Sequence, residues 1–236
     1  MIWQLDEPLA DPAPLNVLYI SRLAKQQGIK VLLSGSGGDD LFTGYRRHLA
    51  LRYQKVWSWL PISARQKLES LSLNLDQSST IGRRMSRLFT SAGTSGDERL
   101  VSYFAWARRN DLFPLFSRSV QQKIETINPA KPMMDFLETI DHKVSSIDRM
   151  LALEQRFFLP DHNLTYTDKM SMAAGVEVRV PFLDQALVEF ASTIPDKYKQ
   201  RGATGKWILK KAMEPFLPHD VIYRPKTGFG APLRRW

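Results

Sequence analysis

The chain has 236 residues, a formal net charge of +9 and no cysteine. The missing cysteine excludes a disulfide framework, a thiolate metal site and a cysteine nucleophile. Because no apolar run approaches the length of about 18 residues that spans a membrane, and residues 1–14 lack the pattern of a signal peptide, we predict a cytoplasmic protein without a membrane partner.

The positive charge is concentrated near the carboxyl end. Residues 197–236 contain ten lysines or arginines against Glu214 and Asp220. This surplus predicts that the region attracts anions, and nucleic acid, nucleotide phosphates and a solvated surface all stay open as explanations. No nucleic-acid-binding signature accompanies the charge, so we rank nucleic acid last among these partners.

The first 33 residues predict a loop, a helix and a strand. Residues 1–14 hold three prolines, which favour extended or turn conformations. Asp11 is well placed to cap the helix that follows, although a functional acidic loop stays open. From Leu15, apolar residues recur at helical spacing up to Gly28, a residue suited to end a helix. Residues 31–33 then form a short apolar run typical of a buried strand.

The most informative stretch is VLLSGSGGDDLFTGYRRH, residues 31–48. The small side chains of residues 34–38 let the loop backbone approach a ligand closely, and the amide groups of the next helix suit an anion. Asp39 and Asp40 repel a bare phosphate, and a Mg²⁺ ion held between carboxylate and phosphate oxygens removes this conflict. A simpler alternative stays open, in which both aspartates only stabilise the start of the helix.

After this loop the apolar residues predict one helix with a single stripe formed by Leu41, Phe42, Tyr45 and Leu49. We expect Tyr45 to be a core residue rather than a ligand. Residues 61–128 predict short helices joined by exposed loops, and they carry no motif that indicates chemistry. The sequence shows no internal repeat and no domain linker.

A second polar stretch covers residues 159–184. Charged or titratable side chains interrupt an apolar region there, at Asp161, His162, Asp168, Lys169, Glu177, Arg179 and Asp184. Buried charges are tolerated when they are paired. We therefore predict a structural ion-pair network that joins Arg179 to Glu177 or Asp184. A role in catalysis or substrate binding stays open for this network, including Asp168 and Lys169.

The third motif, YRPKTGFGAP, covers residues 223–232. Two prolines and two glycines shape a loop around Lys226, and a point charge on a shaped loop suits phosphate transfer, although most basic loops are surface features. The four histidines have no metal-binding spacing, and no set of Ser, His and Asp indicates a nucleophilic triad. Because the sequence ends abruptly at Trp236, we predict a fragment of a longer protein.

The motifs SGSGGDDLFTGY, DKMSMAAGVEVRVPFLD and RPKTGFGAP, in this order and at these separations, closely resemble the synthetase domain of the glutamine-hydrolysing asparagine synthase family. The resemblance covers nearly the whole chain and is weakest between residues 45 and 159. It implies an α/β fold of the adenine-nucleotide α-hydrolase-like (PP-loop ATPase) type, mostly helical here and with few strands. It also implies that ATP activates a carboxylate, aspartate in asparagine synthesis, as an acyl-adenylate, which ammonia from a glutaminase domain then attacks.

The resemblance also implies roles for individual residues. The family residues that match Ser34 and Gly35 contact ATP, and the one that matches Asp39 binds Mg²⁺ together with pyrophosphate. The family lysine that matches Lys226 stabilises the charge that develops at the α-phosphate. Ser36 takes a catalytic position beside the acyl-adenylate and the amine, where family members commonly carry an acidic residue.

The departures from the family pattern leave alternatives open. Because of Ser36, the substrate is open, so a related amidotransferase acting on a sugar acid or another carboxylate is an alternative, as is a nucleotide-binding fragment without turnover. Asp40 replaces a usual glutamate, which is a milder change. The family's first phosphate loop, SGGxDS, and its amino-terminal glutaminase domain are absent. We therefore expect residues 1–236 to form a partial synthetase domain that does not complete the reaction alone, and a homodimer stays open.

Overall fold

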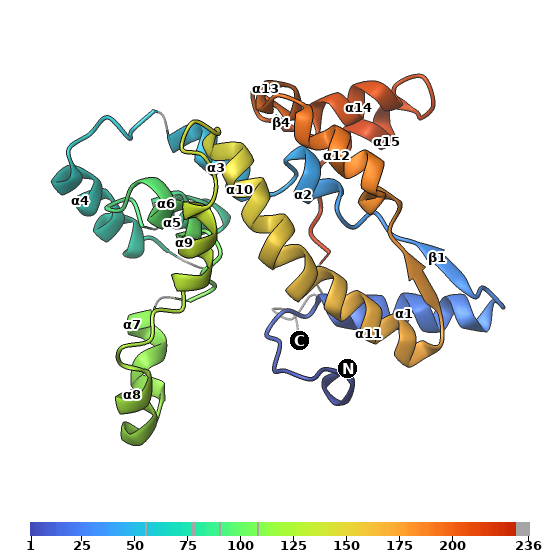
Figure 1. The fold of residues 1–236 in the computed structure, drawn as a ribbon, viewed down its shortest axis with the longest axis horizontal. Helices are drawn as coiled ribbons and strands as arrows, with labels where there is room; N and C mark the ends of the chain where they lie inside the picture. The colour runs from blue at the N-terminus through green and yellow to red at the C-terminus, as the bar shows by residue number, and fades with distance from the viewer. Residues whose placement is uncertain (55, 77–78, 90, 108, 230–236) are drawn as a thin grey trace. The chain divides into compact units, whose positions relative to one another are not determined.

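The structure is a computed structural model that describes residues 1–54, 56–76, 79–89, 91–107 and 109–229 (Figure 1). It is mostly helical with few strands, as predicted. The chain divides into two compact units, Met1–Tyr45 with Glu154–Trp236, and Arg46–Leu153. No linker marks this division in the sequence, since a helix that ends at Leu153 runs directly into a π-helix that begins at Glu154. Among the described residues no helix is both long and apolar enough to cross a membrane.

The first unit carries all the described strands and both ends of the described chain. Its elements are a 3-10 helix Ile2–Gln4, α1 (Ala13–Gln26), β1 (Val31–Leu33), α2 (Gly38–Phe42), the π-helix Glu154–Leu164, α11 (Thr165–Ala174), β2 (Glu177–Arg179), a 3-10 helix Pro181–Leu183, α12 (Gln185–Thr193), α13 (Asp196–Lys199), β3 (Gln200–Arg201), β4 (Thr204–Gly205), α14 (Trp207–Met213) and α15 (His219–Tyr223). β1 pairs with β2 in parallel, and β3 pairs with β4 antiparallel.

The predicted strand at residues 31–33 is confirmed, but its predicted burial is wrong. Val31 lies opposite Glu177 and is 40% exposed, whereas Leu33 lies opposite Arg179 and is 73% exposed. Alternate side chains of a strand share one face, so Val31 and Leu33 project to the same side. Within the described residues this ladder has only two strands, and that face of β1 stays in solvent.

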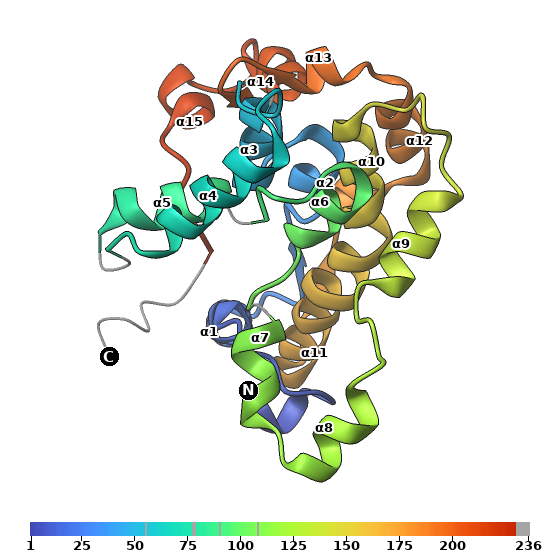
Figure 2. The ribbon, with the colours of Figure 1, turned by 90° about the vertical axis from the view of Figure 1, so that its left-hand side faces the viewer.

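α1 and α11 lie side by side, as Figures 1 and 2 both show. Their interface buries Val17 and Leu18 of α1 against Tyr166 and Met170 of α11. The predicted cap is confirmed, because the N–H of Ala13 donates to Asp11 Oδ1 at 2.9 Å. The predicted stop is also confirmed, since Gly28 follows the helix with a φ of +76°.

A second apolar core supports the loop that follows β1. Leu41 and Phe42 of α2 pack with Ala191 of α12 and with Ile194, and side chains of α14 lie against this cluster. Figure 1 shows α12 and α14 gathered beside α2. This core fixes the orientation of α2, whose first turn carries Asp39.

The predicted single helix after the loop is wrong. α2 ends at Phe42, Thr43 adopts a left-handed φ of 62°, and the next helix begins at Arg46. The turn is stabilised where Thr43 Oγ1 donates to the carbonyl of Lys199 at 2.9 Å. Leu41 and Phe42 are therefore core residues of α2, whereas Tyr45 and Leu49 fall beyond the break and do not continue their stripe.

The second unit consists of short helices, as predicted for residues 61–128. They are α3 (Arg46–Gln54), α4 (Ile62–Leu73), α5 (Thr80–Phe89), α6 (Gly96–Ser102), α7 (Arg109–Leu112), a 3-10 helix Phe113–Leu115, α8 (Arg118–Ile124), α9 (Lys131–Glu138) and α10 (Ser146–Leu153). An ion pair between a buried arginine and a partly buried aspartate joins two of them, because Arg149 Nη2 of α10 lies 2.7 Å from Asp97 Oδ2 of α6. The same guanidinium donates to the carbonyl of Leu137 at 3.1 Å.

Candidate functional site

The loop between β1 and α2 is compact and internally hydrogen-bonded. The N–H of Ser34 extends the β1–β2 ladder by donating to the carbonyl of Arg179 at 2.8 Å. The N–H of Ser36 donates to Ser34 Oγ at 3.2 Å, and the two hydroxyl oxygens lie 2.8 Å apart. Gly35 between them is exposed, and a Cβ there would meet open space. The three predicted loop residues therefore lie together, with the backbone of Gly35 open to a ligand.

Gly37 is required at the end of this loop. Its φ is +90°, and a Cβ at this position would lie 2.5 Å from Leu183 Cδ2. Leu183 belongs to the 3-10 helix before α12. A side chain at Gly37 would therefore push the loop away from the core that supports it, which explains the Gly-rich sequence here.

Asp39 is held between two lysines. Lys206 Nζ lies 2.6 Å from Asp39 Oδ1, and Lys226 Nζ lies 2.7 Å from Asp39 Oδ2. Burial raises the pKa of Asp39, but the two ammonium groups lower it by more, so the net pKa lies below its ordinary value. The carboxylate is therefore ionised at neutral pH.

Backbone contacts bring these groups together from distant parts of the chain. The N–H of Lys206 donates to the carbonyl of Phe42 at 2.8 Å, which places the start of α14 beside the end of α2. Lys226 Nζ also donates to the carbonyl of Gly44 at 2.7 Å. A Cβ at Gly44 would overlap the carboxylate of Asp39 and lie 2.7 Å from Lys206 Cε. Only glycine at position 44 lets the turn approach this closely.

A third lysine, Lys210, stands near the first two. Burial is the largest cause that lowers the pKa of Lys210, and the positive charges of Lys206 and Lys226 lower this pKa further. Its ammonium nitrogen lies 5.5 Å from the centre of the Tyr223 ring. We call Lys206, Lys210 and Lys226 the lysine cluster. Its three ammonium groups outnumber the carboxylate of Asp39 by two, so the site carries a positive charge that suits a polyanion.

The sequence singles out Lys226 but not Lys206 or Lys210. The spacing of four residues between Lys206 and Lys210 is typical of one helical face, and both fall within the basic carboxyl region, so a signal was present. In the structure Lys206 precedes α14 and has a left-handed φ of 55°. The amide groups that begin the helix after the loop are the anion-binding donors that the sequence predicts. That helix, α2, has only five residues, and the lysine cluster is the larger source of positive charge.

Asp40 has different surroundings from Asp39. It is 1% exposed, and its two carboxylate oxygens lie 3.3 and 3.2 Å from the Tyr45 hydroxyl, which donates to them. Asn163 Nδ2 donates to the same hydroxyl at 3.0 Å. Gln155 Nε2 donates to the main-chain carbonyl of Asp40 at 3.2 Å. Asp40 thus joins α2 to the π-helix.

Asp168, Lys169, Glu177 and Arg179, the candidate network of the second polar stretch, do not gather at one point. Arg179 Nε donates to Glu177 Oε1 at 2.8 Å, and both side chains are more than half exposed on β2. Lys169 pairs instead with Asp6 at 2.5 Å. Asp168 is exposed on α11.

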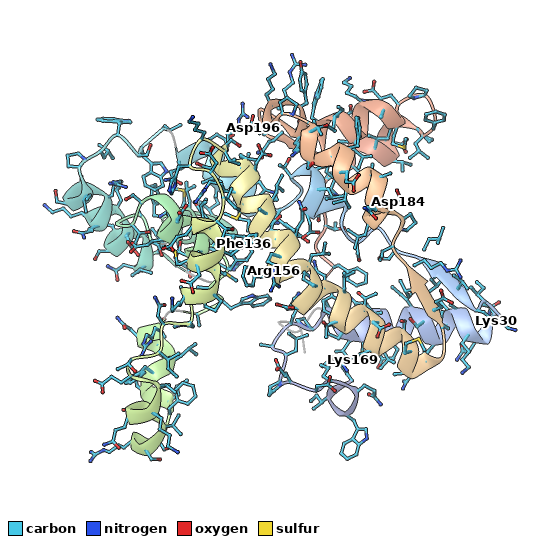
Figure 3. The ribbon with its side chains drawn as sticks, in the orientation of Figure 1. Lys30, Phe136, Arg156, Lys169, Asp184 and Asp196 are labelled. Carbon is cyan, nitrogen blue, oxygen red and sulfur yellow. The ribbon has the colours of Figure 1, made fainter. Side chains whose placement is uncertain are left out.

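Asp184, the other predicted partner of Arg179, caps a helix. Its Oδ1 accepts from the N–H of Leu187 at 3.2 Å, at the start of α12. Figure 3 shows Lys169 and Asp184 far apart, on α11 and before α12. The observed pair on β2 lies in solvent, so the predicted burial of these charges is wrong.

The donor set fits Mg²⁺ only together with a phosphate. The described residues contain no group of three or more Asp, Glu or His side chains that could hold a metal ion. Mg²⁺ in phosphate-transfer sites commonly takes one or two carboxylates and completes its shell with phosphate oxygens and water. Asp39 offers one carboxylate of this kind, and the lysine cluster beside it suits the phosphate oxygens.

Comparisons with known proteins identify the family of this chain. The sequence profile of the family described as asparagine synthase matches residues 1–236. Asparagine synthetase (glutamine-hydrolyzing) 1 of Bacillus subtilis is 32% identical over 240 residues, which cover 100% of this chain and 36% of that protein. Asparagine synthetase (glutamine-hydrolyzing) 3 of the same organism is 37% identical over 214 residues, covering 91% of this chain and 28% of that protein.

A relative with a different name also matches. Amidase chyE of Penicillium rubens is 24% identical over 260 residues, covering 100% of this chain and 37% of that protein. The chain spans about a third of the length of the relatives it matches. Among solved structures, none matches this chain. Because the family profile matches along all 236 residues, this chain belongs to the asparagine synthase family.

Proposed function

We propose that this chain is the ATP-binding synthetase part of a glutamine-dependent amidotransferase, an amide ligase that activates a carboxylate as an acyl-adenylate. The observation that carries the proposal is the position of Asp39 between Lys206 and Lys226, 2.6 and 2.7 Å from their ammonium nitrogens. One carboxylate surrounded by an excess of ammonium groups suits the polyphosphate of ATP with its Mg²⁺ ion. Membership of the asparagine synthase family supports the same function.

The proposed reaction has two steps. A carboxylate oxygen of the substrate attacks the α-phosphorus of ATP, the bond to the β-phosphate breaks, and pyrophosphate leaves. Ammonia then attacks the acyl carbon, loses a proton and displaces AMP, which leaves an amide. Negative charge grows on the phosphates during the first step, and preorganised positive groups lower its energy.

Each proposed site residue has a place in this scheme. Ser34 and Gly35 contact the nucleotide, and the exposed Gly35 backbone supports this role. Asp39 would hold Mg²⁺, which when bound neutralises phosphate charge. Lys226 stabilises the charge that develops at the α-phosphate and, together with Lys206 and Lys210, binds the leaving pyrophosphate. Such a site accords with an adenine-nucleotide α-hydrolase-like fold, in which a parallel strand leads through a small-residue loop into a helix.

The ammonia source and the first phosphate loop belong, in this proposal, to parts of the enzyme outside residues 1–236. The chain spans about a third of its relatives, which are named as glutamine-hydrolysing. A glutaminase domain in the complete enzyme would release ammonia from glutamine. We assign structural rather than catalytic roles to Asp168, Lys169, Glu177 and Arg179. Lys169 pairs with Asp6 of the loop before α1, and Arg179 pairs with Glu177 within β2.

Aspartate, giving asparagine, is the first candidate substrate. Ser36 is a reason to test a second candidate substrate. Its side chain is a neutral hydroxyl, whose oxygen lies 2.8 Å from the hydroxyl oxygen of Ser34. A neutral group at this place suits a carboxylate substrate without the ammonium group of an amino acid, such as a sugar acid. The match to a protein named as an amidase accords with such variation.

The test is exchange of labelled pyrophosphate into ATP by the complete enzyme, with aspartate or sugar acids supplied in turn. Lys226→Ala is expected to slow this exchange about a hundredfold to a thousandfold, the usual effect of removing one group that stabilises the transition state. Lys123→Ala is the matched control, because Lys123 is exposed on α8, and it should leave the exchange unchanged.

Other outcomes separate the alternatives. An unchanged exchange rate in folded Lys226→Ala enzyme contradicts the catalytic role of Lys226. Exchange with sugar acids but not with aspartate replaces the first candidate substrate by the second. If calorimetry shows that Mg²⁺–pyrophosphate binds while no carboxylate supports exchange, the chain is a nucleotide-binding module without turnover.

A further inference from the structure

Lys226 is held by contacts at its head rather than along its loop. Every residue from 224 to 229 is exposed, so the loop itself packs little against the unit. The ammonium group donates to Asp39 Oδ2 and to the carbonyl of Gly44, both at 2.7 Å. It also lies 5.0 Å from the centre of the Tyr45 ring, over its face. Asp39, Gly44 and Tyr45 therefore define the position of this lysine.

The Tyr45 ring is itself fixed from two elements. Its hydroxyl donates to the buried carboxylate of Asp40 in α2 and accepts from Asn163 Nδ2 in the π-helix at 3.0 Å. Its ring meets Phe158 edge to face, with centroids 5.6 Å apart and an interplanar angle of 83°. The expectation that Tyr45 is only a core residue therefore leaves out its polar contacts and the ammonium group on its ring.

We propose that Tyr45 is a positioning residue for Lys226, whose ring face sets the place of the ammonium group and thereby the affinity for the pyrophosphate part of ATP. The proposal rests on the function proposed above. An aromatic face attracts a cation through its quadrupole and offers no ligand to Mg²⁺. This contact therefore holds Lys226 in place whether Asp39 pairs with a lysine or binds a metal ion.

Two substitutions separate the ring from the hydroxyl. Tyr45→Leu removes the ring face, and we expect it to weaken Mg²⁺–pyrophosphate binding by the full chain about threefold to tenfold, within the range of single cation–π contacts. Tyr45→Phe keeps the ring and should restore most of the affinity, to within about twofold of the unmodified protein. Tyr19→Leu is the matched control, because Tyr19 is 62% exposed on α1.

A double-mutant cycle shows whether Tyr45 acts through Lys226. In a Lys226→Ala background, Tyr45→Leu should cause no further loss of pyrophosphate affinity. Equal losses with and without Lys226 overturn the proposal, as does a Tyr45→Phe variant that binds as weakly as Tyr45→Leu, since the hydroxyl would then be the active group. If the unmodified chain binds no pyrophosphate, the proposed function fails first.

An NMR measurement without ligand tests the proposal even if the Tyr45→Leu variant does not fold. The ring face should shift the proton signals of the Lys226 ε-methylene upfield in NMR spectra of the unmodified chain and of Tyr45→Phe. Lys226→Ala identifies these signals by their disappearance. An unshifted Lys226 methylene in both proteins overturns the proposal, and this result does not depend on pyrophosphate binding.

Discussion

Asp39 is the residue on which the charge balance of the site depends. Without its carboxylate, the lysine cluster would bring ammonium groups together with no compensating charge. With it, the lysines are held close to one another before any ligand arrives. A polyphosphate that enters the site therefore meets donors already in place, which lowers the cost of ordering them on binding.

The lowered pKa of Asp39 predicts how the stability of the chain depends on pH. Its folded pKa lies below the value of about 3.9 expected in the unfolded chain. The ionised carboxylate therefore stabilises the fold above that value, and this contribution is lost as the pH falls through the folded pKa. Urea unfolding should show Asp39→Asn less stable than the unmodified chain at pH 7, with a difference that shrinks below about pH 3.9.

Asp220→Asn is the control for this measurement, because Asp220 is exposed in the first turn of α15. Its stability should follow that of the unmodified chain at both pH values. A difference between Asp39→Asn and the unmodified chain that grows in acid contradicts the ion-pair explanation.

At the scale of residues, some members of the candidate site can be predicted from the sequence and others cannot. Ser34, Gly35, Asp39 and Lys226 lie in short motifs that can be recognised locally. Lys206 becomes a neighbour of Asp39 only because its N–H binds the carbonyl of Phe42, 164 positions earlier in the chain. Local patterns do not encode such a long-range contact, so the sequence alone does not single out Lys206.

At the scale of elements, the pair between α6 and α10 has the clearest energetic consequence. Arg149 is 5% exposed and binds both carboxylate oxygens of Asp97, at 2.8 and 2.7 Å. Its Nη1 donates to the carbonyl of Ile140 at 2.9 Å. Removing the guanidinium leaves a partly buried carboxylate without this partner, and such a loss typically costs about 3 to 5 kcal/mol.

We therefore expect Arg149→Ala to lower the free energy of unfolding by about that amount in urea titrations. Arg118→Ala is a suitable control, since Arg118 is exposed at the start of α8. A loss below about 1 kcal/mol, within the range of exposed pairs, would mean that the pair contributes no more than a surface contact.

Elements also show where sequence patterns mislead. The run at residues 31–33 has the composition of a buried strand, and it does form β1. Its burial depends on further layers beside the β1–β2 ladder, which the described residues do not contain. The predicted apolar stripe from Leu41 to Leu49 is wrong for another reason. Thr43 leaves the helical conformation, and its hydroxyl donates to the carbonyl of Lys199, which stabilises the turn.

At the scale of the whole molecule, a net charge of +9 is compatible with a nucleic-acid partner. Several basic side chains are already paired with carboxylates, including Lys131 with Asp135 and Lys211 with Glu214. Two lysines of the cluster, Lys206 and Lys226, in contrast share the single carboxylate of Asp39. This arrangement suits a small polyanion better than an extended duplex, whose binding needs many phosphate contacts.

Excess duplex DNA at about 0.15 M salt should therefore change the affinity for Mg²⁺–pyrophosphate by less than about twofold in calorimetric titrations. The same titration at low salt is the control, because weak charge-driven binding of DNA appears there first. DNA that displaces pyrophosphate at physiological salt, with an affinity that falls steeply as salt rises, would favour a nucleic-acid partner instead.

The distance along the chain between Asp39 and Lys226 has a consequence for synthesis. These residues are 187 positions apart, and the whole second unit lies between them. Proteins are made from the amino end at about 5 to 20 residues per second. The ribosome therefore releases Asp39 roughly ten to forty seconds before its partner. During that interval the nascent chain carries the loop without its cations, so the contacts around Asp39 form only after most of the chain has been made.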